Sequence, residues 1–163
     1  PISFNETKEA SKMNIATRLS ALNFLDNGGA IGVFPGGTVS TAQSPFGVPM
    51  DPGWRSFTAK MITRSDAQVV PIFFEGHNSR LFQVASHIHY NLRMGLLIKE
   101  FKSKVGNPVK IAIGNTLSDT AIKSRSGNPR ILMDFLREET YKLSRTPLDN
   151  FNYGYEFESR YQI

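Results

Sequence analysis

Hydrophobic positions along the chain follow two spacings that alternate from one segment to the next. Apolar residues at every third or fourth position predict amphipathic helices over residues 7–27, 54–64, 79–104 and 131–143. Short apolar runs of the kind that form buried strands stand between these segments, at residues 30–34, 68–75 and 109–113. The alternation predicts an α/β fold in which helices flank a mainly parallel central sheet.

Capping residues set the expected boundaries of two of these helices. Asp51-Pro52 should begin the second helix, because aspartate is a common N-cap and proline suits the first helical position. Asn78 or Ser79 should cap the third helical segment, which we expect to break into two helices near residue 91.

Length and composition are those of one globular domain. The chain has 163 residues, of which 40% are hydrophobic and none is cysteine. The absence of cysteine excludes disulfides, thiolate metal ligands and thiol nucleophiles in this sequence. No apolar run approaches the roughly 20 residues that span a bilayer. We expect a cytoplasmic location, with or without association with the inner face of the membrane.

Both ends of the chain carry separate expectations. The sequence begins at Pro1 on what reads as the end of a strand, so we expect further residues upstream. Residues 145–163 are rich in aromatic side chains, and we expect this C-terminal tail to pack back on a single domain formed by residues 1–163.

The most informative polar segment follows the first apolar run. Two glycines, Gly36 and Gly37, are followed by hydroxyl side chains at Thr38, Ser40 and Thr41. Ligands of open α/β sheets bind beyond the carboxyl ends of strands, and glycines there allow successive N–H groups to surround an anion. The segment therefore suits phosphate binding, and a plain polar turn is the alternative.

A second polar cluster follows the next apolar run, at residues 75–80. Arg80 could bind an anionic group through two parallel hydrogen bonds, and His77 could act as a general base. The alternative is that this segment only caps the start of a helix. His87 and His89 are two positions apart and would point to different helix faces, so we expect no metal site.

Basic residues account for a formal net charge of +5. Several of them, including Lys99, Lys102 and Lys104, surround apolar residues of the third helical segment. This pattern suits peripheral contact with an anionic membrane, and it equally suits a core helix with a solvated basic face. No stacking platform or recognition-helix signature is present, so we expect no nucleic-acid partner.

Three blocks of the sequence resemble the phospholipid/glycerol acyltransferase family, in its bacterial lysophospholipid-acyltransferase-like branch. Residues 34–40 read Phe-Pro-Gly-Gly-Thr-Val-Ser and resemble the family's Phe-Pro-Glu-Gly-Thr-Arg-Ser block. Residues 70–72 resemble its Val-Pro-Val/Ile block, and residues 54–60 resemble the helix between the two. The similarity continues through residues 76–83.

The resemblance implies transfer of a fatty acyl group from acyl-CoA or acyl-carrier protein, as co-substrate and without another cofactor, to a hydroxyl of a lysolipid-type acceptor. It implies that the block with Gly36, Gly37, Thr38 and Ser40 binds the acceptor, and we expect Arg80, from the polar cluster at residues 75–80, to be a second anion contact. Gly36 stands where the family has glutamate, and Val39 where it has arginine. The acceptor could therefore carry a head group other than glycerol phosphate.

The family's catalytic His-x4-Asp motif does not occur in the sequence. We expect this dyad upstream of Pro1, which would make the chain the C-terminal portion of a glycerolipid-acyltransferase-like domain, truncated on its N-terminal side and inactive alone. Substitution of His77 as the base is the weaker alternative. A non-catalytic lipid- or phosphate-binding module on the same scaffold is the alternative function.

Overall fold

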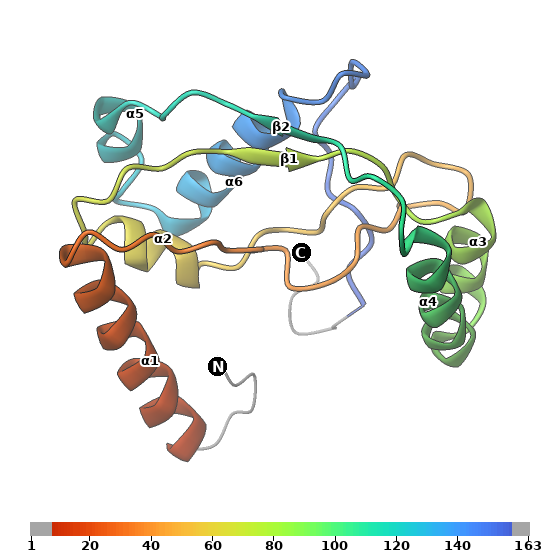
Figure 1. Cartoon of the computed structure of the whole chain (residues 1–163), viewed down its shortest axis with the longest axis horizontal. Coiled ribbons are helices and arrows are strands. Elements are labelled where there is room, and N and C mark those ends of the chain that lie inside the picture. The colour runs from red at the N-terminus through yellow and green to blue at the C-terminus, as the bar shows by residue number, and fades with distance from the viewer. Residues whose placement is uncertain (1–7, 158–163) are drawn as a thin grey trace.

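The computed structural model describes residues 8–157. In chain order its elements are α1 (Lys8–Asp26), α2 (Phe57–Ile62), β1 (Ile72–Phe74), α3 (Arg80–Ile88), α4 (Tyr90–Lys104), β2 (Ile111–Ile113), α5 (Asp119–Lys123) and α6 (Pro129–Tyr141) (Figure 1). All four predicted helical segments contain helix, and the segment at residues 79–104 is broken into two helices, as predicted.

The sheet is antiparallel, and this corrects part of the predicted fold. β1 pairs with β2 so that Phe73 lies opposite Ala112. Main-chain hydrogen bonds extend the pairing beyond the strands, from Leu117 to Val69 at one end and from Glu75 to Lys110 at the other. The α/β class holds, but a mainly parallel sheet is not shown by residues 8–157.

The helical hairpin between the two strands explains their direction. A single helix between two strands returns the chain to the end from which it started, which makes the strands parallel. Here α3 and α4 pack against each other as a pair at one end of the sheet (Figure 1). The chain therefore re-enters the sheet at the end it left, and β2 runs opposite to β1.

Residues 30–34 form no strand in the structure, so that prediction is wrong. Ile31, Val33 and Phe34 are exposed, and the main chain of residues 30–33 makes no hydrogen bond to any part of the chain that the structure describes. The segment is extended and runs near β1 (Figure 1), where the Phe34 ring lies 5.6 Å from that of Phe74. Apolar character alone does not make a strand without a hydrogen-bonding neighbour.

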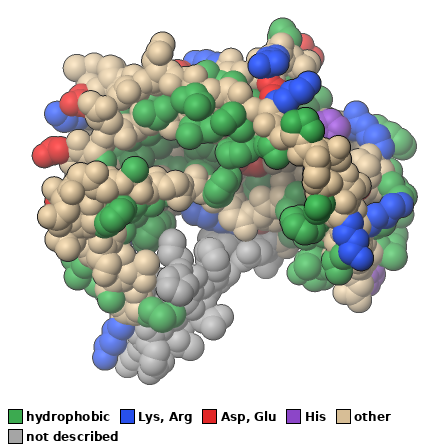
Figure 2. All heavy atoms as spheres, in the orientation of Figure 1, with side chains coloured by type: hydrophobic (Ala, Val, Ile, Leu, Met, Phe, Trp, Pro, Cys, Tyr) green, Lys and Arg blue, Asp and Glu red, His purple; other side chains and the backbone are tan. Residues whose placement is uncertain are grey.

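The hydrophobic core lies between α2, α5, α6 and the inner face of the sheet. Its buried residues are Ala59, Ile122, Leu132, Met133 and Leu136. The outer face of the sheet is apolar but open: the side chains of Ile72, Phe74, Ile111 and Ile113 are 44–64% exposed. Figure 2 shows hydrophobic side chains gathered across the middle of the molecule. The two faces of the sheet thus differ in burial but not in hydrophobicity.

Candidate functional site

The glycine turn after residue 34 has the conformation that its sequence suggested. Gly37 has a φ of +67°, in the left-handed region that favours glycine, and its N–H donates to the carbonyl of Phe34 at 3.3 Å. Within residues 8–157, the N–H groups of Gly36 and Thr38 donate to no other group. Thr38 is exposed, so its N–H is open to an anion, as in other concavities formed by successive N–H groups, whereas Gly36 is buried.

Asp51 lies against this turn. Its carboxylate accepts hydrogen bonds from the Ser40 hydroxyl and, at 2.9 Å, from the Trp54 indole N–H. A Cβ added at Gly36 would lie 3.3 Å from the Asp51 carboxyl group. The prediction that Asp51 caps the second helix is wrong, because α2 begins five residues after Pro52 and its N-cap is Ser56.

A basic side chain reaches the same turn from the segment that follows. The position of a Cβ on Gly37 would be 3.8 Å from Nε of Arg55. The Arg55 guanidinium forms an ion pair of 2.9 Å with Glu156, and the main-chain N–H of Arg55 donates to the carbonyl of Pro35 at 2.9 Å. The turn therefore has an acidic neighbour, Asp51, and a basic neighbour.

Arg93 from α4 forms hydrogen bonds with the part of the loop that follows the turn, at residues 39–41. Its guanidinium donates to the Thr41 hydroxyl at 2.7 Å and to the Val39 carbonyl at 3.3 Å, and it stacks over the Phe157 ring at 4.1 Å. Arg93 is 4% exposed, and burial lowers the pKa of its guanidinium. No carboxylate of the described residues lies within 4.0 Å, so this cation adds uncompensated positive charge beneath the loop.

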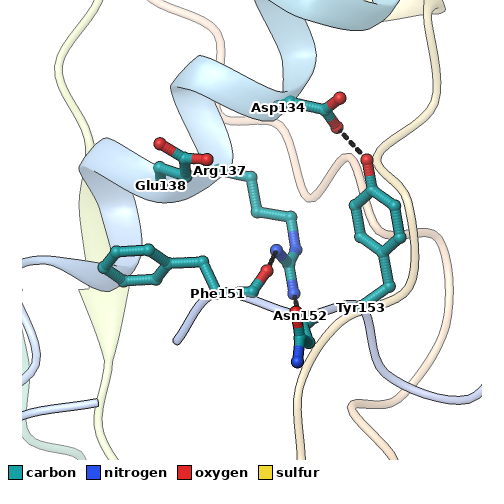
Figure 3. A pocket seen from close by; sticks show the side chains of 6 residues that line it. All are labelled: Asp134, Arg137, Glu138, Phe151, Asn152 and Tyr153. Carbon is teal, nitrogen blue, oxygen red and sulfur yellow. Dashed lines mark hydrogen bonds between the residues drawn. The ribbon is translucent and has the colours of Figure 1, made fainter. Parts of the chain in front are cut away.

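A second buried arginine holds the far end of the loop. Arg137 from α6 is 1% exposed and donates to three carbonyls, those of Phe151 at 2.6 Å and of Asp51 and Asn152 at 2.9 Å each. Figure 3 shows the guanidinium pointing from the helix towards residues 151–153, beside a hollow of about 220 Å³. Because these carbonyls engage Arg137, the hollow does not offer its charge to a ligand.

Tyr141 lies beneath Asp51 and gives the loop a pH-dependent contribution to stability. Its hydroxyl accepts the Asp51 N–H at 2.8 Å, and burial, together with the Asp51 charge, raises the pKa of Tyr141 from 10.0 to about 12. The unfolded chain loses this proton first as pH rises, so the folded state binds more protons between the two values. The free energy of unfolding should then fall by about 1.4 kcal/mol per pH unit from this group.

We expect Tyr141→Phe to remove this fall in the unfolding free energy at alkaline pH. The variant will be less stable at pH 8, because the Asp51 N–H loses its partner, but its unfolding free energy should decline less steeply than that of the parent protein between pH 10 and 12. Urea titrations at pH 8, 10, 11 and 12 measure the difference between the two proteins. Parallel curves would contradict the assignment.

The other predicted site residues lie apart from the turn or carry no orienting acid. Thr38 is exposed beside Gly37, whereas Arg80 bonds to the carbonyl of Gly47 at 2.6 Å, further along the loop. Nδ1 of His77 lies 2.9 Å from the Asn78 carbonyl. Ser79 caps α3, accepting the N–H of residue 82, as predicted. Among the described residues, no hydrogen bond or ion pair joins Arg80 to the glycine turn.

The remaining histidines do not form a metal site with their neighbours. Nε2 of His87 lies 2.9 Å from the Ala42 carbonyl, and Nδ1 of His89 accepts the Asn91 N–H at 3.1 Å. In the part of the chain that is described, no group of three or more His, Asp or Glu side chains is placed to hold a metal ion. Over the same part, none of the helices combines the length and the hydrophobicity needed to cross a membrane.

Four charged residues lie around the loop that were not predicted from the sequence as part of the site. They are Asp51, Arg55, Arg93 and Arg137. Only Asp51 stood out in the sequence, where its position before proline suggested a helix cap. Arg93 and Arg137 stand at helix positions that should be buried. Because buried cations require polar partners, this was the signal that could have placed these two arginines in a polar site.

Comparison with known proteins assigns the chain to a family. It matches the acyltransferase family over residues 3–150 and therefore belongs to that family. This confirms the prediction at the level of acyl transfer in general: a transferase with an acyl donor and an acceptor substrate. Searches of curated proteins and of solved structures found no match.

Proposed function

We propose that the protein acts in the transfer of a fatty acyl group from a thioester, acyl-CoA or acyl-carrier protein, to a hydroxyl of a lysolipid-type acceptor, as an O-acyltransferase of membrane lipid biosynthesis. The observation that carries the proposal is the turn at Gly36 and Gly37, beside which the N–H of the exposed Thr38 donates to no other described residue. In this proposal the turn binds the anionic head group of the acceptor.

The charges around the turn support an anionic ligand. Arg93 is buried without a carboxylate within 4.0 Å among the described residues, and it bonds to the loop that carries the turn. A positive charge that no acid neutralises raises the local potential and attracts an anion. Arg55 beside Gly37 adds a further positive charge on the outside of the turn, shared with Glu156.

Asp51 and Arg55 also bear on the two departures from the family's block. The block resembled by residues 34–40 has glutamate and arginine where this chain has Gly36 and Val39. In the structure the Asp51 carboxylate lies where a side chain on Gly36 would point. We infer that Asp51 and Arg55 supply, from the following segment, the polar contacts that the block itself lacks.

The reaction joins the acceptor oxygen to the thioester carbonyl carbon and breaks the carbon–sulfur bond. A base takes the hydroxyl proton as the oxygen attacks, and the donor leaves as a free thiol. His77 lacks the carboxylate partner of the family's dyad, because the described hydrogen bond of its ring is to the Asn78 carbonyl. In this proposal the base is the histidine of a His-x4-Asp motif, which residues 1–163 do not contain.

A non-catalytic binding module is the second candidate. It is favoured by the hydrogen bonds of the three histidines, which within the described residues are to main-chain groups and not to carboxylates. Such a module would keep the anion-binding turn and would not release thiol.

Two measurements on the protein extended by the residues encoded upstream of Pro1 separate these candidates. Release of free thiol from palmitoyl-CoA, in proportion to added lysophosphatidic acid, would support the enzyme. A rise in melting temperature with glycerol 3-phosphate or lysophosphatidic acid, without thiol release, would support binding alone. The proposal fails if neither thiol release nor stabilisation is seen.

A substitution in the turn tests where the head group binds. Alanine at Gly37 is strained by about 1–2 kcal/mol in the left-handed region, so Gly37→Ala should distort the turn and weaken head-group binding about tenfold. Gly32→Ala is the matched control, because a Cβ there meets nothing within 4 Å. Titrations of both variants with lysophosphatidic acid, read by melting temperature, give the comparison. Equal affinities would remove the turn from the binding site.

A further inference from the structure

Helix α4 is apolar on the side that faces solvent. Five of its exposed positions are spaced by four, four, three and four residues, which places them on one face of the helix. They are Tyr90, Met94, Ile98, Phe101 and the C-cap Val105, with exposed fractions of 58%, 42%, 62%, 71% and 66%. We call these five side chains the α4 stripe.

The side of α4 that faces the protein carries the buried charges. Arg93 is 4% and Glu100 8% exposed, and Glu100 accepts the Ser79 N–H at 3.0 Å from the start of α3. A helix at the surface of a globular protein normally buries its apolar face and solvates its charges. In α4 the lysines are solvated but the stripe is also left in contact with water, which is unfavourable.

Charge distinguishes the α4 stripe from the other open apolar surface, the outer face of the sheet. Residues 80–104 contain five Lys and Arg but a single acid, Glu100, so this segment holds +4 of the formal net charge of +5. Since Glu100 is buried, the exposed surface of the hairpin has no acidic side chain between these limits. Lys99 and Lys102 are exposed beside the stripe. Figure 2 shows basic and hydrophobic side chains interleaved at this end of the molecule.

We propose that the α4 stripe, flanked by Lys99 and Lys102, docks on the surface of a bilayer that contains anionic lipids. An apolar face bordered by lysines is the arrangement that inserts shallowly between lipid head groups, with the lysines at the level of the phosphates. Tyr90 at one end of the stripe suits the interface as well, because its ring is apolar and its hydroxyl polar. The charge complementarity selects an anionic bilayer over an uncharged apolar partner.

The docked face connects directly to the loop that carries the glycine turn. Arg93 bonds to Thr41 from the inner side of α4, and Gln83 of α3 accepts the Ala42 N–H at 3.0 Å. The hairpin would thus hold this loop near the lipid head groups. The docking itself goes beyond the proposed acyl transfer and is tested without donor or acceptor.

Co-sedimentation of the chain with vesicles tests the proposal. We expect binding to vesicles of phosphatidylcholine with 40% phosphatidylglycerol, binding at least tenfold weaker to pure phosphatidylcholine, and a marked loss in 0.5 M salt. Lys99→Gln with Lys102→Gln should weaken binding to the anionic vesicles by about fivefold for each lysine. Ile98→Ser with Phe101→Ser should weaken it by about tenfold or more.

Matched variants on the sheet face complete the test. Phe74→Ser with Ile113→Ser removes exposed apolar side chains without changing α4, and it should leave vesicle binding unchanged. The proposal is overturned if the sheet variant loses binding as much as the α4 variant, or if neither α4 variant differs from the parent. It is also overturned if the stripe mediates self-association instead, seen as a concentration-dependent mass in sedimentation equilibrium that Ile98→Ser with Phe101→Ser abolishes.

Discussion

Replacing Gly154 with alanine is expected to detach residues 151–157 from the loop that carries the glycine turn. Gly154 is buried, and a Cβ on it would overlap the carbonyl oxygens of Met50 and Thr41. These are backbone atoms, so they cannot move aside as a flexible side chain would. The loop and the C-terminal segment can accommodate the extra carbon only by separating.

The separation would break a set of hydrogen bonds that Gly154 and its neighbours make. The Gly154 N–H donates to the Asp51 carbonyl at 2.8 Å, and the Tyr155 N–H donates to the Thr41 carbonyl at 2.9 Å. Together with the steric overlap, their loss should cost roughly 3 kcal/mol of unfolding free energy. For a domain of this size that corresponds to about 10 °C in melting temperature.

Thermal unfolding and hydrogen exchange at residues 151–157 measure this effect. Gly127→Ala is the control, because a Cβ at Gly127 meets nothing within 4 Å. If Gly154→Ala melts within a degree or two of the control and its C-terminal segment keeps its protection, the close packing described for Gly154 is incorrect.

Arg137→Met should destabilise the protein to a similar extent for an electrostatic reason. Methionine has a comparable length and fills the space, but it donates no hydrogen bond to the carbonyls of Phe151, Asp51 and Asn152. Buried acceptors that lose a charged donor cost about 1–3 kcal/mol each, partly recovered by water, so we expect a total of about 3 kcal/mol. Burial lowers the pKa of Arg137, yet arginine remains charged at neutral pH.

Urea unfolding of Arg137→Met against Arg64→Met tests this expectation. Arg64 is exposed just beyond α2, so its substitution removes a cation without removing buried hydrogen bonds. A midpoint for Arg137→Met equal to that of the control would show that the guanidinium contributes no net stability. Combined with Gly154→Ala, the effect should be less than the sum, because both substitutions release the same segment.

Local sequence signals predicted the helices well and the sheet less well. Each of the four segments predicted from periodicity contains helix, and Ser79 was correctly identified as a cap, because both depend on neighbouring residues; the short helix α5 was not predicted. The direction of β2 depends on how α3 and α4 pack, which involves contacts far apart in the sequence. The strand expected at residues 30–34 required a partner strand, and among the described residues none pairs with it.

The residues of the candidate site also differ in whether the local sequence could predict them. Gly36 and Gly37 were found from their own residue types, because a left-handed turn needs glycine. Asp51 and Arg55 reach that turn, and Arg93 reaches the loop just after it, from 14 or more positions away in the sequence, so no local pattern could connect them to it. The absence of a paired histidine, in contrast, was already visible as the missing His-x4-Asp.

The open outer face of the sheet also affects how steeply the unfolding free energy of this chain varies with temperature and with denaturant. The heat capacity change and the denaturant dependence of unfolding both grow with the apolar surface that unfolding newly exposes. Ile72, Phe74, Ile111 and Ile113 are already 44–64% exposed in the folded state, so they add little to either quantity. The stability curve of this chain should therefore be flatter with temperature than that of a domain of equal length whose sheet is covered on both faces.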